Sequence, residues 1–407
     1  MLYVAFFLSL FEKWSLKYHF KLNFSYDLLI ILIFFFLVII YTLYADHSKY
    51  FKIFITTTAL LSIFSFLFSS VDLYNFTINE VIILGGISLT YISYRKRGYF
   101  NLDKFIKINM IYIFICFVFY LYIKFICFDD SILYLINSGN GYLYPFYSSG
   151  GFSLTFSEPS FAGCYLVTML AIIYSSERYN KTKNNILITI IFIVLIYLSK
   201  SKISLAIGIT LILFNLLKNK KNFSAILSII IISYLPLTIL YSLTISIFDI
   251  KPVFIEWLPE GSKESFYTRF FFIFTRFSYI FTDIFGFSSN LDVSIIKKTL
   301  MDYTSNIPSE YKDELVGYIK NPLYFVPKDY ISFITYNFGI ASLIILSIIQ
   351  YSIYYLMLNN KLKYESNNMI LVSFLFLSFS INLTSISILM LLPSFFQDKK
   401  NLRKDLH

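Results

Sequence analysis

The chain has 407 residues, of which 57% are hydrophobic and only 14% are charged, and its net charge at pH 7 is +10. The mean hydropathy of +0.68 excludes an ordinary soluble domain, because no soluble core needs repeated apolar runs of bilayer length. The basic balance does not indicate nucleic-acid binding, since the surplus Lys and Arg residues fall in short connections between apolar runs, where they orient membrane spans.

Apolar runs along the chain predict an all-α, polytopic integral membrane helical bundle. The expected spans cover residues 2–11, 27–45, 51–70, 76–94, 106–127, 161–176, 186–199, 203–217, 223–248, 336–358 and 369–396. The last run would form roughly 42 Å of helix, which exceeds the roughly 30 Å hydrocarbon core of a bilayer. A hairpin near Asn382 would divide it into two short helices, so we expect about 11–12 transmembrane helices.

Basic clusters orient these spans. Lys and Arg gather at residues 95–107, 178–183, 218–221 and 361–363, which places these connections on the cytoplasmic side. The connections then expected outside are residues 128–160, 199–202 and 249–335.

The last of these connections is a long polar segment in an otherwise hydrophobic chain. Residues 249–335 hold eleven of the 24 acidic residues and five of the nine prolines. We therefore expect three parts: an N-terminal transmembrane bundle (1–248), one large extracytoplasmic loop (249–335), and C-terminal transmembrane helices with a basic tail (336–407).

Several kinds of site are missing from the sequence. Cys116, Cys127 and Cys164 lie in or beside apolar runs, and the three histidines do not cluster, so neither a disulfide nor a metal site is expected. We find no Walker A loop, no Gly-rich dinucleotide loop, no HExxH and no Asp-x-Asp pair. These absences predict no cofactor and no metal.

A Glu-Pro-Ser element at residues 156–163 (Phe-Ser-Glu-Pro-Ser-Phe-Ala-Gly) ends the external loop and opens the span at 161. Pro159 is favoured at the first helical position and moves the residue before it out of the α region. Glu158 is therefore expected at the helix N-cap, at the membrane face, where an acid is usually functional. The alternative is a carboxylate that only caps the helix.

A second element is the very short connection Ser199-Lys200-Ser201-Lys202, called the Ser-Lys turn below. Two ammonium groups on the outer face oppose the positive-inside trend, which indicates that they meet a negatively charged group. The alternative is that both lysines snorkel to lipid phosphates.

A third element is an expected amphipathic helix at residues 264–287. Arg269, Arg276 and Asp283 recur every seven residues and therefore share one face. Two guanidinium groups on one face can bind phosphate oxygens. The alternative is anchoring at the membrane interface.

These elements together resemble the O-antigen and capsular polysaccharide repeat-unit polymerases, which are related to the O-antigen ligases. The resemblance lies in their order: the entry Leu-Asn-Phe-Ser-Tyr-Asp (22–27), the Glu-Pro-Ser element, the Ser-Lys turn, a large loop with arginines, and a Gly-Ile entry to the next span at Gly339. The chain departs from the family pattern in having Lys328-Asp329 where many members carry His-Asn. The large loop contains no histidine base.

The resemblance implies a metal-independent membrane glycosyltransferase that polymerises oligosaccharide repeat units carried on undecaprenyl pyrophosphate, a polyprenyl pyrophosphate. The acceptor hydroxyl would attack the anomeric carbon while the lipid pyrophosphate leaves, and the product would be O-antigen of lipopolysaccharide or capsule. The implied place is the outer face of the bacterial cytoplasmic (inner) membrane. The implied partners are the lipid-linked oligosaccharide, the lipid bilayer, a chain-length regulator and a flippase, with no nucleic acid.

The candidate residues follow from this chemistry. Glu158 is the expected general base, and cations would stabilise the charged leaving group. The expected catalytic residues are Glu158, Arg269 and Arg276. The expected substrate-binding residues are Ser160, Lys200, Lys202, Asp283, Lys328 and Asp329, and the two aspartates are also reserve bases.

Three alternatives stay open. A ligase would use the same donor to transfer finished glycan to another acceptor. A flippase or other transporter would place charged residues inside the bundle, and the expected span centres are almost free of charge. A non-enzymatic membrane scaffold is the last alternative.

Overall fold

The computed structural model describes part of the chain, and every regular element in that part is helical. The described residues are 1–10, 26–45, 49–67, 73–96, 101–122, 125–126, 151–152, 154, 159–176, 184–217, 267, 300–301, 303–305, 309, 313–320, 332, 334–335, 342–345, 347–348 and 388–395. The expectation of an all-α protein is thus confirmed for these residues.

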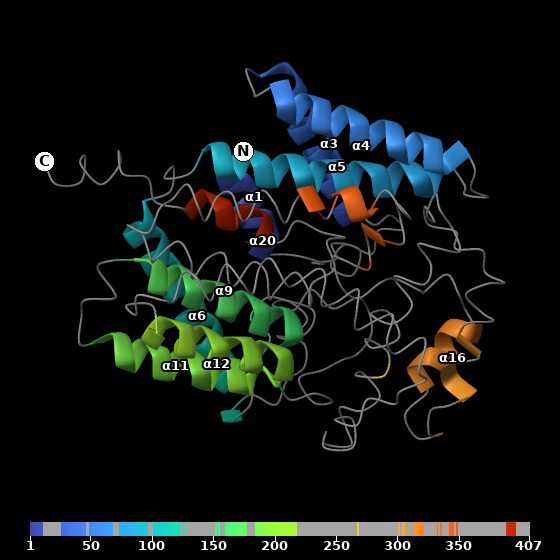
Figure 1. Cartoon of the computed structure of the whole chain (residues 1–407). Coiled ribbons are helices and arrows are strands. Elements are labelled where there is room, and N and C mark those ends of the chain that lie inside the picture. The colour runs from blue at the N-terminus through green and yellow to red at the C-terminus, as the bar shows by residue number, and fades with distance from the viewer. Residues whose placement is uncertain are drawn as a thin grey trace, which may run out of the picture. The chain divides into compact units, whose positions relative to one another are not determined.

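The helices with assigned bounds are drawn in Figure 1. They are α1 (Leu2–Leu10), α3 (Tyr26–Tyr44), α4 (Lys49–Leu67), α5 (Leu73–Arg95), α6 (Leu102–Tyr122), α9 (Pro159–Ser175), α11 (Asn184–Leu198), α12 (Lys202–Leu217), α16 (Asp313–Lys320), α20 (Ile388–Leu391) and the 3₁₀ helix η5 (Leu392–Phe395).

The eight spans expected before residue 218 each coincide with a helix to within a few residues. The expected span at 223–248 lies outside the described residues, and those at 336–358 and 369–396 are described only in part. The expected hairpin residue Asn382 also lies outside them.

One described helix, α6, is long and apolar enough to cross a membrane. Shorter apolar stretches cover Ile30–Tyr44, Phe161–Ser175, Ile186–Leu198 and Ser204–Leu217. Length and composition therefore identify one candidate span among the described helices.

The chain divides into two compact units. The first comprises residues 1–48, 81–224 and 360–407, and the second comprises residues 49–80 and 225–359. The boundary falls inside α5, and all residues of the large polar loop (249–335) belong to the second unit.

The centre of the first unit is α9, which packs against α6, α11 and α12 (Figure 1). Every residue of the stretch 162–176 is buried. Gly208 of α12 allows the close packing, because a Cβ at this position would stand 3.3 Å from Cδ1 of Ile196 on α11 and 3.9 Å from Cγ2 of Val167 on α9. Small residues at helix contacts permit such approach.

Aromatic rings join the first and last helices of this unit. The ring of Phe105 on α6 lies 4.8 Å from that of Phe6 on α1 and 4.5 Å from that of Phe395 on η5, measured between centroids. Residues from both ends of the sequence are thus part of one core.

In the second unit a described contact joins two residues of the large polar loop. The Tyr303 hydroxyl donates a hydrogen bond to the carbonyl oxygen of Tyr267 at 3.2 Å, and Thr304 is buried.

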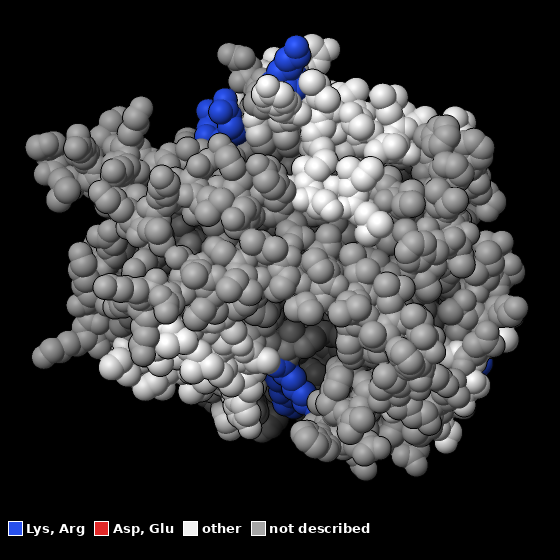
Figure 2. Space-filling view, in the orientation of Figure 1, with Lys and Arg blue, Asp and Glu red and all other residues white. Residues whose placement is uncertain are grey.

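On the face drawn in Figure 2, the described surface carries a few separate Lys and Arg side chains and shows no described Asp or Glu.

Candidate functional site at the Ser-Lys turn

The start of α9 packs directly on the Ser-Lys turn. The helix begins at Pro159, as the sequence predicts. One turn later lies the buried Gly163, and a Cβ added there would stand 2.7 Å from Oγ of Ser204 and 2.8 Å from both Oγ of Ser199 and Cβ of Ser201. Only glycine fits this approach, so the last position of the Glu-Pro-Ser element has a steric role. Two elements that are remote in sequence meet here.

Ser201 is the N-cap of α12. The Ser204 amide donates to Oγ of Ser201 over a long 3.4 Å, and the Leu205 amide donates to the Ser201 carbonyl at 2.9 Å. The hydroxyls of Ser201 and Ser204 also share a hydrogen bond of 2.7 Å. Serine is a preferred N-cap because its hydroxyl accepts from an otherwise unpaired amide. The thiol of Cys164 lies 3.5 Å from the Ser204 hydroxyl and extends this group onto α9.

Lys200 is in the left-handed conformation, with φ of 54°. Its amide donates to the Tyr197 carbonyl at 2.9 Å, which is one of the two bonds of a Schellman C-cap. The second bond is replaced by a hydroxyl bridge, in which the Ser201 amide donates to Oγ of Ser199 at 3.4 Å and Ser199 donates to the Ile196 carbonyl at 2.6 Å.

This conformation has a cost for lysine. A left-handed residue other than glycine is less stable by roughly 1–2 kcal/mol, and glycine is the usual residue at this position. A lysine kept where glycine would be more stable motivates a functional hypothesis for its ammonium group.

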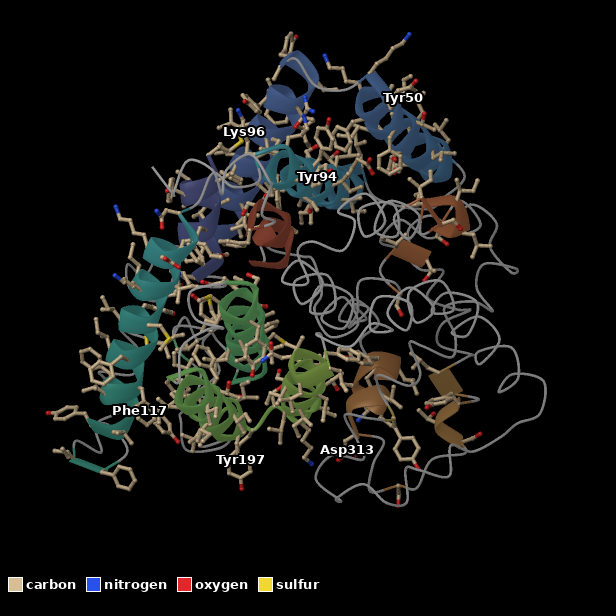
Figure 3. All side chains as sticks on the ribbon, turned by 60° about the vertical axis from the view of Figure 1, so that its left-hand side comes forward. Tyr50, Tyr94, Lys96, Phe117, Tyr197 and Asp313 are labelled. Carbon is tan, nitrogen blue, oxygen red and sulfur yellow. The ribbon has the colours of Figure 1, made fainter. Side chains whose placement is uncertain are left out.

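The turn presents both lysines on an exposed surface. Lys200 and Lys202 are exposed, whereas Ser199 and Ser204 are buried beneath them. Tyr197, which is 68% exposed, points away from the end of α11 (Figure 3). Buried hydroxyls therefore support a surface that carries two positive charges.

The described part of the chain does not include the side chains of the other expected site residues. Ser160 lies in the first turn of α9, and its side chain is outside the described set. The remaining expected residues, Glu158, Arg269, Arg276, Asp283, Lys328 and Asp329, lie outside the described residues. Their roles stay predictions. Among the described residues no group of His, Cys, Asp or Glu side chains could hold a metal ion.

Two polar groups escaped the sequence analysis. Asn109 on α6 is buried, accepts a hydrogen bond from the Tyr165 hydroxyl on α9, and donates from Nδ2 to the Phe105 carbonyl at 2.8 Å. Glu80 on α5 has a carboxylate oxygen that is buried without a hydrogen-bond partner. An acid inside the expected span 76–94 is a signal that hydropathy analysis could have found.

No family model, no curated protein and no solved structure matches the chain.

Proposed function

We propose that the chain is a multi-pass membrane glycosyltransferase that polymerises oligosaccharide repeat units carried on a polyprenyl pyrophosphate. The observation that supports this proposal is the packing of Gly163, which ends the Glu-Pro-Ser element, on the turn that carries Lys200 and Lys202. Glu158 immediately precedes the described start of α9 at Pro159. A carboxylate and two ammonium groups thus belong to adjoining elements.

The membrane part of the proposal rests on exposed apolar side chains. On α6 the exposed large hydrophobic residues are Ile108, Ile111, Phe114, Ile115, Val118, Phe119, Leu121 and Tyr122. The opposite face of α6 is mainly apolar, with Phe105, Ile106, Ile113 and Tyr120 buried there beside one polar residue, Asn109. A helix that is apolar all round is stable only when it is buried or surrounded by lipid.

Two further helices show the same pattern. α3 exposes Ile30, Ile33, Phe36, Leu37 and Tyr41, and α11 exposes Ile186, Leu187, Ile190, Ile191 and Val194. Lipid is the occupant that fits such surfaces on several helices. The proposed place is the bacterial cytoplasmic membrane.

In the proposed reaction an acceptor hydroxyl of one lipid-linked unit attacks the anomeric carbon of another. A glycosidic C–O bond forms while the anomeric C–O bond to the pyrophosphate breaks. Glu158 takes the hydroxyl proton as general base, and polyprenyl pyrophosphate leaves as an anion. The ammonium groups of Lys200 and Lys202 stabilise the charge that develops on the phosphates. In the same scheme Arg269 and Arg276 supply further positive charge.

The test is the length distribution of lipid-linked and surface glycan in a strain that lacks the protein. Wild type should restore a ladder of chain lengths, whereas the deletion and Glu158→Gln, at matched protein level, should accumulate single repeat units. A full ladder of chain lengths in the Glu158→Gln strain would show that this carboxylate only caps the helix. Long chains that stay on the carrier in the deletion strain would identify the ligase instead.

Transport of the lipid-linked unit is a second candidate function, and Glu80 is the observation that favours it. Its buried, unpartnered carboxylate oxygen is the kind of intramembrane group that marks a transport path. In the same deletion strain, transport predicts that repeat units never reach the outer face.

A further inference from the structure

Phe152 is one of the most completely buried aromatic residues in the described part of the chain. It is 1% exposed, and it comes from the long connection between α6 and α9. Its ring meets two rings of α6 edge to face, those of Phe117 at 5.9 Å and Tyr120 at 5.4 Å between centroids. Phe117 is labelled on α6 in Figure 3. Edge-to-face pairs of this kind stabilise beyond simple burial.

The backbone of Phe152 binds the end of α11, the residue directly before the Ser-Lys turn. Its amide donates to the carbonyl oxygen of Leu198, the last residue of α11, at 2.8 Å. The last carbonyls of a helix have no partner within the helix, so this bond satisfies one of them. Leu198 is followed directly by Ser199 and the left-handed Lys200.

The neighbouring residue Leu154 shows how firmly this segment is held. Leu154 is 3% exposed and has a positive φ of 53°. A leucine keeps this conformation only where surrounding contacts determine it. The turn is therefore held from two sides, by Phe152 at Leu198 and by Gly163 at Ser199 and Ser204.

We propose that Phe152 is a positioning residue, which fixes the Lys200 turn against α6 so that the Lys200 ammonium meets the pyrophosphate of the donor. This inference rests on the proposed glycosyl transfer. Phe152 acts through the turn and not on the substrate, so its contribution depends on the presence of Lys200. A displacement of about 1 Å in a charge that stabilises the transition state is enough to lower turnover strongly.

The test is a double-mutant cycle with the purified full-length protein in lipid vesicles that contain a lipid-linked repeat unit. Phe152→Leu should lower kcat by about tenfold or more while the KM for the donor changes much less. Lys200→Gln should lower kcat at least as strongly. The double variant should equal Lys200→Gln alone, because Phe152 has no further effect once the ammonium group is gone.

Two controls separate this role from simple stability. Phe35→Leu removes the same atoms from another fully buried phenylalanine, and it should leave kcat per folded molecule unchanged and act independently of Lys200. Amide hydrogen exchange in residues 151–154 should rise in Phe152→Leu, since the bond to Leu198 loosens. Phe152→Met is the milder variant if Phe152→Leu folds poorly.

Each outcome decides between separate claims. Unchanged kcat in Phe152→Leu, or effects of Phe152→Leu and Lys200→Gln that multiply, would overturn the positioning role while the transfer reaction stands. Unchanged exchange in residues 151–154 would overturn the anchoring itself. If the wild-type protein is inactive in this assay, both the proposed transfer reaction and this inference are contradicted. We expect Phe152→Leu to lower kcat only in protein that still carries Lys200, and to raise amide exchange in residues 151–154.

Discussion

Gly163 and Ser199 lie in contact at the start of α9 and the end of α11, close enough that a Cβ on the glycine would stand 2.8 Å from the serine hydroxyl oxygen. These residues are 36 positions apart in a chain of 407. The contact joins the Glu-Pro-Ser element to the Ser-Lys turn. Because the hydroxyl of Ser199 also closes the left-handed turn at Lys200, an intrusion at Gly163 disturbs the lysine as well.

Gly163→Ala should destabilise the protein and reduce chain polymerisation. The new methyl group overlaps two hydroxyls and a Cβ, and overpacking of this kind costs about 1–3 kcal/mol. A lower apparent Tm in detergent would measure it. Gly317→Ala is the matched control, because nothing lies within 4 Å of its added Cβ on α16. That variant should be neutral or slightly more stable. Equal Tm values for the two variants would contradict the contact.

Lys200→Gly should separate stability from activity. Glycine adopts positive φ without strain, so the variant should gain roughly 1 kcal/mol of stability and show a higher apparent Tm. It also lacks the ammonium group, so polymerisation should fall. Lys200→Ala is the companion variant, since it loses the charge and keeps the strain. Full polymerisation by Lys200→Gly would leave the lysine without the proposed role.

Tyr165→Phe should lower stability through a residue on another helix. It removes the hydroxyl that donates to Asn109 and leaves a buried amide oxygen without this donor. Such a loss costs about 1–3 kcal/mol. Thermal unfolding of Tyr165→Phe, Asn109→Leu and the double variant forms a cycle, in which the double variant should be more stable than the sum of the single losses predicts. Additive losses would show that the two groups are not coupled.

Glu80→Gln distinguishes the two candidate functions. If the chain polymerises glycan, the variant should keep its ladder of chain lengths, because Glu80 lies on α5 and takes no part in the proposed transfer. Its stability should be equal or higher, since a carboxylate with one buried oxygen that lacks a hydrogen bond is costly. Two quantities are measured: the length of the glycan and the amount of repeat unit on the outer face. A smaller amount of repeat unit on the outer face would favour transport.

The positions of the helices before residue 218 were accessible from the sequence because each of them lies in an apolar run. From α1 to α12 each expected span met a helix, and Pro159 marked the start of α9 as its fixed φ predicts. The close contact at Gly163 was not accessible, since it depends on how α9 packs against α12. The glycine in the Glu-Pro-Ser element was noticed only as part of a pattern.

The conformation of Lys200 could not be predicted for a different reason. Sequence rules assign left-handed C-caps to glycine or asparagine, and the turn here contains only serine and lysine. The hydroxyl bridge through Ser199 replaces the missing Schellman bond, and such a bridge has no sequence signature. Phe152 was likewise hidden in a long connection, where burial against α6 cannot be read from periodicity.

The central claim is that this chain alone joins lipid-linked repeat units. The most direct measurement uses the purified full-length protein in vesicles supplied only with repeat units on polyprenyl pyrophosphate, with a metal chelator present, followed by separation of the glycans by length. The account predicts a ladder of longer lipid-linked glycans with release of polyprenyl pyrophosphate, and single units with Glu158→Gln. Repeat units that remain single with folded wild-type protein would contradict it.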